Sequence, residues 1–160
     1  MPPIRERPRA PDGYGFSTSP EGMLDWPRVS QALANAEVYW LGTVRPGGGP
    51  HMTSIWGAWV GEHLYFEGGD DTRWARNLAA DPRLSFGAVS AGLHISGRGV
   101  IEKAAAGEAF SAVADCYGAK YSYRPEQDLF SVLLPEVVIA LDMSSMDSFA
   151  SSPTRFRWAS

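Results

Sequence analysis

The stretch "HMTSIWGAWVGEHLYF", residues 51–66, sets the expectation for the fold. Its two halves are rich in threonine, isoleucine, valine and aromatic residues, which is the composition of β-strands. Between the halves, "VGEH" supplies a Gly-Glu pair of the kind that makes a tight hairpin turn. We therefore predict a long strand over residues 51–60, a turn, and a returning strand over residues 64–66.

Further strands are predicted on both sides of this hairpin, with short helices between them. The predicted strands span residues 37–44, 51–60, 64–66, 83–90, 93–103 and 136–145. The predicted helices span residues 25–36, 72–80 and 105–118, and residues 122–135 are expected to be an irregular connection. Because most strands follow one another through tight turns, a mainly β (α+β) antiparallel barrel or sandwich is favoured over a parallel sheet.

Length and composition indicate one folded domain. The chain has 160 residues, of which 44% are apolar and 20% charged, as is usual for folded domains. Residues 1–21 are rich in proline and glycine, so we predict a flexible N-terminal arm there and a single domain over residues 22–160.

Charge and cysteine content narrow the partners and the compartment. The net charge is −4 and the basic residues are scattered, which argues against a nucleic-acid partner. No apolar run has the length of a membrane span, and the N-terminus lacks a signal-peptide core. A single cysteine, Cys116, excludes an intrachain disulfide and suits a reducing compartment. A cytoplasmic protein without a membrane partner is therefore expected.

Common catalytic motifs are missing from the sequence. It contains no G-x-S-x-G, no G-x-G-x-x-G and no Walker loop, and no His/Cys cluster has zinc spacing. Three histidines lie on predicted strands without a recognisable nucleophile beside them. Cys116 is predicted to lie mid-helix, where a buried thiol is favoured over a nucleophile. We therefore predict no metal site and assign no catalytic side chain.

The stretch "GGDDTRWARNLAADP", residues 68–82, follows the hairpin and opens a predicted helix. Free N–H groups at a helix N-terminus, with the hydroxyl of Thr72 and the guanidinium of Arg73, would suit a phosphate. The alternative is a capped surface helix with Arg73 and Arg76 in solvent. Asp70 and Asp71 would repel a phosphate, so the residues alone slightly favour the capped helix.

In combination, residues 39–86 strongly resemble the pyridoxamine 5′-phosphate oxidase-like FMN-binding split-barrel family, which includes a branch that uses the deazaflavin coenzyme F-420. Residues 95–103, "ISGRGVIEK", and the C-terminal "TRFRW" resemble later parts of the same family. The positions that carry the resemblance are Thr43, Gly49-Pro50, Leu64-Tyr65-Phe66, Thr72-Arg73, Asn77-Leu78 and Asp81-Pro82-Arg83.

This resemblance implies a six-stranded antiparallel split β-barrel with short flanking helices that forms a homodimer. It also implies a cofactor at the subunit interface, FMN or alternatively F-420, with its ring along residues 52–56 and its phosphate at Thr72 and Arg73. The implied cofactor-binding residues are Met52, Thr53, Ser54, Ile55, Trp56, Glu67, Gly68, Thr72, Arg73, Trp74 and Asn77. Tyr39, His51, Glu67 and Trp56 are expected near the substrate, and Arg155 and Trp158 near the neighbouring subunit's site.

The sequence departs from the family pattern at three places. Trp74 replaces the lysine that usually follows the arginine, and Thr53 and Ala58 stand where true pyridoxamine phosphate oxidases carry Arg and Lys. The Arg-x-His substrate signature of those enzymes is missing from the C-terminal part. We therefore expect a flavin- or deazaflavin-dependent oxidoreductase with another, unknown substrate. The alternative is a non-catalytic flavin- or haem-binding or storage protein.

Overall fold

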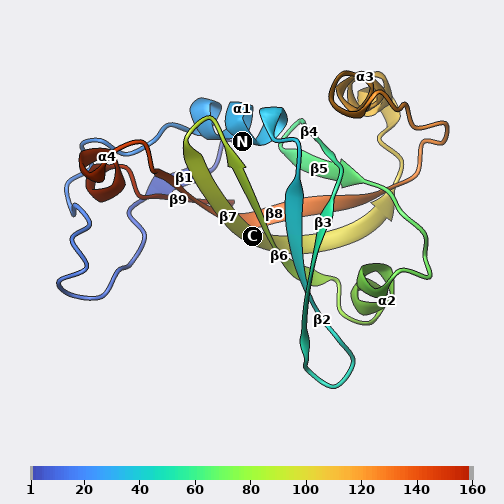
Figure 1. Cartoon of the computed structure of the whole chain (residues 1–160), viewed down its shortest axis with the longest axis horizontal. Helices are drawn as coiled ribbons and strands as arrows, with labels where there is room; N and C mark the ends of the chain where they lie inside the picture. The colour runs from blue at the N-terminus through green and yellow to red at the C-terminus, as the bar shows by residue number, and fades with distance from the viewer. Residues whose placement is uncertain (1, 159–160) are drawn as a thin grey trace.

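The computed structural model describes residues 2–158, in which nine strands form one antiparallel sheet (Figure 1). Its main path runs β1-β9-β8-β7-β6-β2-β3, and β5 joins β8 and carries β4. The strands are β1 (Ile4–Glu6), β2 (Tyr39–Val44), β3 (Pro50–Ile55), β4 (Ala58–Val60), β5 (His63–Phe66), β6 (Arg83–Ser90), β7 (Leu93–Ala104), β8 (Phe130–Asp142) and β9 (Thr154–Arg157). The helices are α1 (Trp26–Asn35), α2 (Arg73–Ala80), α3 (Phe110–Tyr121) and α4 (Met146–Ser151), with a 3₁₀ turn η1 (Gly107–Ala109) before α3.

The predicted fold class, a mainly antiparallel β structure with short helices, is confirmed, and the sheet does not close, as in a split barrel. The strand count is nine in the described residues, where six were predicted. Two of the additional strands are the terminal pair β1 and β9. The third arises because the predicted strand over 51–60 is interrupted after Ile55 and continues as β4.

Strand β8 also begins earlier than predicted, at Phe130 and not at residue 136. Pro135 lies inside β8, and a proline cannot donate a ladder hydrogen bond, so the sequence there resembles a loop. The structure accommodates Pro135 opposite Gly99, next to a register shift between Arg98 and Gly99. Such irregularities are a usual way for a sheet to hold a proline.

Helix α1 covers the main core, and α3 covers a second, smaller one. Asp25 caps α1 by accepting a hydrogen bond from the backbone N–H of Arg28 at 2.8 Å, and Pro27 occupies its first turn. Val29 and Leu33 of α1 are completely buried against the sheet. The smaller core contains Val113 and Tyr117 of α3 and, from the sheet, Ala58, Tyr65, Phe130 and Val132.

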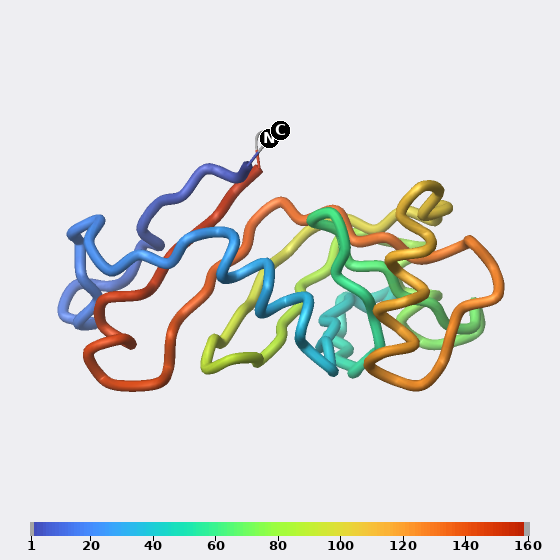
Figure 2. Tube along the Cα trace, turned by 90° about the horizontal axis from the view of Figure 1, so that it is seen from above, coloured from blue at the N-terminus to red at the C-terminus, as the bar shows by residue number. Residues whose placement is uncertain are grey.

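The two ends of the described chain lie side by side (Figure 2), because β1 pairs with β9. The Arg7 guanidinium donates to the carbonyl oxygens of Ser151 at 2.7 Å and Pro153 at 2.9 Å. Part of the segment over residues 1–21 is therefore paired with the sheet. Its flexibility, and a single domain over 22–160, stay predictions, and residues 1, 159 and 160 lie outside the described residues. Between residues 2 and 158, no helix has the length and apolar character needed to cross a membrane.

We predict that Asp142→Asn lowers the free energy of unfolding at pH 7 by about 1.5–3 kcal/mol, the scale of hydrogen bonds to a charged group. The Asp142 carboxylate accepts from the Ser144 hydroxyl at 2.5 Å, from the Ser144 N–H at 3.0 Å and from Arg28 at 2.6 Å. These bonds lower its pKa to about 2. The stabilisation is therefore fully present above the unfolded pKa of about 3.9 and is lost as the pH falls towards 2.

Urea unfolding of the parent protein and of Asp142→Asn, at pH 7 and near pH 2.5, measures this effect. The difference between them should shrink at the lower pH. Asp12→Asn, at an exposed position, is the matched control and should change little at either pH. Equal stability of Asp142→Asn and the parent protein at pH 7 would contradict the prediction.

Candidate functional site

The feature that shapes the site is the interruption between β3 and β4 at Trp56 and Gly57. Strands β2 and β3 pair from Val44 opposite Pro50 to Tyr39 opposite Ile55, and β4 then pairs with β5 instead. A Cβ atom on Gly57 would lie 2.8 Å from the end of the Leu64 side chain and 3.2 Å from the Tyr65 carbonyl oxygen, so the close packing here favours glycine. As a result β3 ends the main path of the sheet and, within residues 2–158, pairs with β2 alone.

Helix α3 fixes this interruption with its last turn. The Tyr121 hydroxyl accepts from the Gly57 N–H at 3.1 Å and donates to the Glu37 carbonyl at 2.9 Å. Its ring stacks on Trp56, with ring centroids 4.6 Å apart and an interplanar angle of 3°. Lys120 donates to the carbonyl oxygens of Ala36 at 2.6 Å and Gly57 at 3.2 Å, and burial lowers the pKa of its amine.

The part played by α3 was not predicted from the sequence. The signal available was the pair Tyr117 and Tyr121, four residues apart and therefore on one helix face. Tyr117 donates to the carbonyl oxygen of Trp56 at 3.3 Å, so both tyrosines contact the interruption between β3 and β4. After the helix, the Tyr123 hydroxyl donates to the Glu67 carboxylate at 2.5 Å, which raises the pKa of Tyr123.

The five residues predicted to follow a cofactor ring lie along β3 and just beyond it. Met52 and Trp56 are exposed, with 71% and 54% of their surface accessible, and Ser54 is exposed beside them. Thr53 and Ile55 are half-buried, as expected from the alternation of side chains along a strand. The backbone N–H and C=O groups on the edge of β3 away from β2 have no strand partner among the described residues.

The predicted phosphate end lies at the start of α2. The Thr72 hydroxyl caps this helix by accepting from the Ala75 N–H at 3.3 Å, so the capped-helix interpretation holds. The backbone N–H groups of Arg73 and Trp74 nevertheless make no hydrogen bond within the described residues. The Arg73 side chain is exposed and forms no ion pair there, and Asp70 is paired with Lys103 at 3.2 Å. The Thr72 side chain therefore caps the helix, and two backbone N–H groups in its first turn still have no partner in the described residues and could bind an anion.

Two other predicted residues of this region face the interior. Trp74 packs against Phe66, with ring centroids 5.3 Å apart, and lies so close to Gly68 that a Cβ there would be 2.6 Å from the indole. It also lines a cavity of about 260 Å³ between α2 and β7. Asn77 is completely buried and donates to the Thr43 hydroxyl at 3.0 Å. Direct contact of Trp74 or Asn77 with a cofactor stays a prediction.

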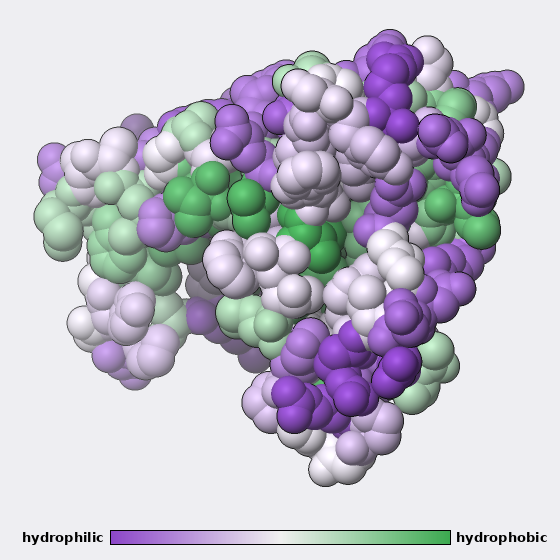
Figure 3. All heavy atoms as spheres, turned by 45° about the vertical axis from the view of Figure 1, so that its right-hand side comes forward, coloured by the Kyte–Doolittle hydropathy of each residue, from purple (hydrophilic) through white to green (hydrophobic). Residues whose placement is uncertain are grey.

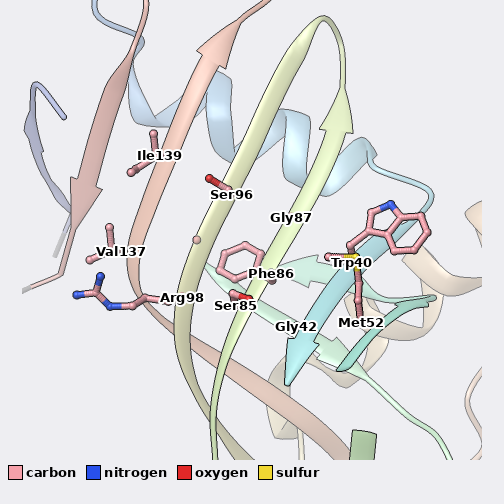
Figure 4. Close-up of a pocket in the computed structure, with 11 residues that line it drawn as sticks. Trp40, Gly42, Met52, Ser85, Phe86, Gly87, Ser96, Arg98, Val137 and Ile139 are labelled. Carbon is pink, nitrogen blue, oxygen red and sulfur yellow. The ribbon is translucent and has the colours of Figure 1, made fainter. Parts of the chain in front are cut away.

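Two neighbouring cavities lie beside β3. The first, of about 480 Å³, is bordered by Trp40, Met52, Phe86, Arg98 and Ile139 (Figure 4). The second, of about 750 Å³, shares Gly42, Met52, Ser85 and Arg98 with the first and adds Thr43, His51, Asp81, Arg83 and Glu136. Met52 is thus the predicted cofactor residue that borders both cavities.

Apolar side chains lie exposed on this molecule among hydrophilic ones, as the face in Figure 3 shows. The exposed large apolar residues near β3 include Trp40, Val44, Met52, Trp56 and Val89. Trp40 and Met52 also border the first cavity (Figure 4). A surface of this kind usually marks an interface or a ligand-binding groove.

A profile of the pyridoxamine 5′-phosphate oxidase family matches residues 26–146, which is most of the chain. The chain belongs to this family. No curated protein matches its sequence. The match includes β2 to β8 and both helices that flank the candidate site.

Solved structures similar to this pyridoxamine 5′-phosphate oxidase family member support the same fold. An F420 reductase is 23% identical with a TM-score of 0.55, covering 75% of this chain and 98% of that one. A heme binding protein from Mycobacterium smegmatis is 21% identical with a TM-score of 0.62, covering 77% and 59%. A pyridoxamine 5′-phosphate oxidase-related, FMN binding protein from Nostoc punctiforme is 14% identical with a TM-score of 0.51, covering 73% and 80%. At these identities the likeness establishes the fold.

Three other residues that were expected near the substrate or the neighbouring subunit's site form hydrogen bonds within the chain. Tyr39 is completely buried and donates to the Leu33 carbonyl, so the expectation that it borders an open pocket is wrong. Trp158 donates to Glu62 at 3.3 Å, and Arg155 donates to Glu6 at 2.8 Å. A reach of these two side chains into a partner's site stays a prediction.

We predict that Gly68→Ala lowers the free energy of unfolding by about 1–3 kcal/mol, because its Cβ would overlap the buried Trp74 indole. Gly49→Ala is the control, since a Cβ there meets only the Arg45 side chain at an ordinary 3.8 Å. Chemical denaturation of both variants measures the difference. Equal stability of the two variants would show that the loop before α2 moves away from Trp74 without cost.

Proposed function

We propose that this protein is an oxidoreductase that uses a flavin-type cofactor, FMN or alternatively the deazaflavin F-420, bound along β3. The observation that carries the proposal is the edge of β3 that pairs with no strand within residues 2–158, in a family member whose α2 begins with N–H groups that make no hydrogen bond there. An unpaired strand edge presents alternating N–H and C=O groups. The polar edge of a flavin ring offers the complementary acceptors and donors.

The residues present fit such a group. At the phosphate end, the Arg73 and Trp74 N–H groups, the positive end of α2 and the Arg73 guanidinium would hold the anion. Arg76, one turn further along α2, is also exposed and forms no ion pair with any residue in 2–158. It offers a second cation where Trp74 has replaced the usual lysine.

When bound, the cofactor would supply two-electron transfer to or from a small conjugated substrate, and the protein would bind and orient both. Met52 and Trp56 would border the ring, and the stack on Tyr121 would keep Trp56 from rotating over it. The Thr53 and Ala58 substitutions favour a substrate other than pyridoxamine phosphate, because the positive charges of the true oxidases are missing at these positions.

We also propose a cytoplasmic homodimer, in which a second copy covers the exposed apolar side chains beside β3. Exposed Trp40 and Met52 favour such a cover, since large apolar side chains cost free energy in water. The partner would close the cavities that Met52 borders and complete the cofactor site. The cytoplasm suits a chain whose single Cys116 cannot form an intrachain disulfide.

A second candidate function is non-catalytic binding or storage of haem or flavin. The similarity to a heme binding protein favours it. The two functions differ in turnover: an oxidoreductase is reduced by a nicotinamide or by reduced F-420 and is reoxidised by a substrate. A storage protein would keep its ligand without catalysing either step.

Parallel titration of the purified protein with FMN and F-420 tests the proposal. We expect micromolar or tighter binding of one of them, and a roughly 10- to 100-fold weaker affinity in Arg73→Ala, the scale of a charged hydrogen bond. Arg5→Ala, at an exposed position on β1, is the matched control and should bind like the parent protein. Haem is titrated in parallel.

Three results would speak against the proposal. Absence of binding by either FMN or F-420 would overturn the cofactor assignment. Tight binding of haem alone would favour the storage function. Equal affinity of Arg73→Ala and Arg5→Ala would leave the cofactor but remove Arg73 from its phosphate site.

A further inference from the structure

Three buried or half-buried polar side chains form a chain of hydrogen bonds from α2 to β3. Asn77 Nδ2 donates to Thr43 Oγ1 at 3.0 Å, and Thr43 Oγ1 lies 3.3 Å from His51 Nδ1. Asn77 and Thr43 are both buried, with 0% and 3% of their surface accessible, and His51 is half-buried. The three residues lie on α2, β2 and β3, so the chain connects three separate elements.

The direction of these hydrogen bonds follows from the number of protons available. With Asn77 Nδ2 facing Thr43, only Asn77 Oδ1 is left without a partner among the buried side-chain atoms of the described residues. The reverse amide orientation would leave a buried NH₂ group, which has two donors, without any. Thr43 therefore accepts from Asn77, which leaves its single hydroxyl proton available for donation to His51 Nδ1.

This direction sets the state of the histidine ring. If Nδ1 accepts a proton from Thr43, neutral His51 carries its own proton on Nε2. Nε2 lies on the side of the ring away from Nδ1 and makes no hydrogen bond with any residue between 2 and 158. His51 borders the cavity of about 750 Å³ beside β3.

We propose that Asn77 and Thr43 are positioning residues that hold His51 as a neutral Nε2–H donor towards an oxygen acceptor in this cavity. The acceptor would be a carbonyl or phosphate oxygen of the bound cofactor or substrate, and this part rests on the proposed function. Asn77 would thus act on the ligand through Thr43 and His51 and not by touching it.

The charged residues of the same cavity are paired with one another. Arg83 is paired with Asp81 at 2.6 Å, and Arg98 lies 3.5 Å from Glu136. Each guanidinium is thus largely compensated, whereas the His51 N–H has no partner in the described chain. The arrangement also disfavours His51 as an axial ligand of haem, because ligation needs the Nε2 lone pair, and here Nε2 carries the proton.

Nitrogen NMR of the histidine rings tests the chain of hydrogen bonds from Asn77 to His51 without any cofactor. In protein labelled with ¹⁵N-histidine, at an alkaline pH where histidine rings are neutral, we expect His51 as the single Nε2–H tautomer. Thr43→Val, which keeps the side-chain shape, should give a mixture of both tautomers, and Thr43→Ser should restore the single one. A Nδ1–H tautomer in the parent protein, or an unchanged tautomer in Thr43→Val, would overturn the proposal that Thr43 and Asn77 set the tautomer of His51.

Titration with FMN and F-420 tests the ligand side of the same proposal. We expect His51→Leu to bind the preferred cofactor about two- to tenfold more weakly, the scale of one neutral hydrogen bond, and His51→Gln, which keeps an N–H donor, to recover most of this loss. Wild-type affinity in His51→Leu would show that His51 does not bind the cofactor. The NMR result would still decide whether Thr43 and Asn77 set the tautomer of His51. Absence of any cofactor binding by the parent protein would overturn the ligand role together with the proposed function.

Discussion

The candidate site depends on the interruption of one strand at Gly57. A Cβ atom at this position would lie 2.8 Å from the end of the Leu64 side chain and 3.2 Å from the Tyr65 carbonyl oxygen, so the close packing favours glycine. Beyond this interruption, β4 pairs with β5, while β3 stays at the end of the main sheet path. The interruption thus separates a packed hairpin from an edge of β3 that pairs with no strand within residues 2–158.

Two helices hold the neighbourhood of that edge. Tyr121 of α3 binds the Gly57 N–H and stacks on Trp56, which fixes the end of β3. At α2, the Arg73 and Trp74 N–H groups make no hydrogen bond within residues 2–158, while Asn77 reaches inward to Thr43 of β2. Rigid elements therefore position the strand edge, the helix opening and His51, as a binding site requires.

Much of the fold could be predicted from local sequence. The hairpin at residues 58–66 and the cap at Thr72 follow from turn and capping chemistry, and the family from the combination of short motifs. The interruption at Gly57 was missed because alternation continues through it in the sequence, and the contacts of Gly57 with Leu64 and α3 depend on tertiary packing. Asn77 was expected beside a phosphate, whereas its buried bond to Thr43 depends on how α2 packs on the sheet.

Amide hydrogen exchange with and without saturating FMN, or F-420 if that is the preferred cofactor, tests the use of the β3 edge most directly. If the ring binds there, exchange should slow for amides within residues 52–56 and for the Arg73 and Trp74 N–H groups. Exchange in β9, which lies at the other end of the main sheet path, should stay unchanged. Saturated protein in which residues 52–56 exchange as fast as in the free protein would contradict the assignment of the cofactor to β3.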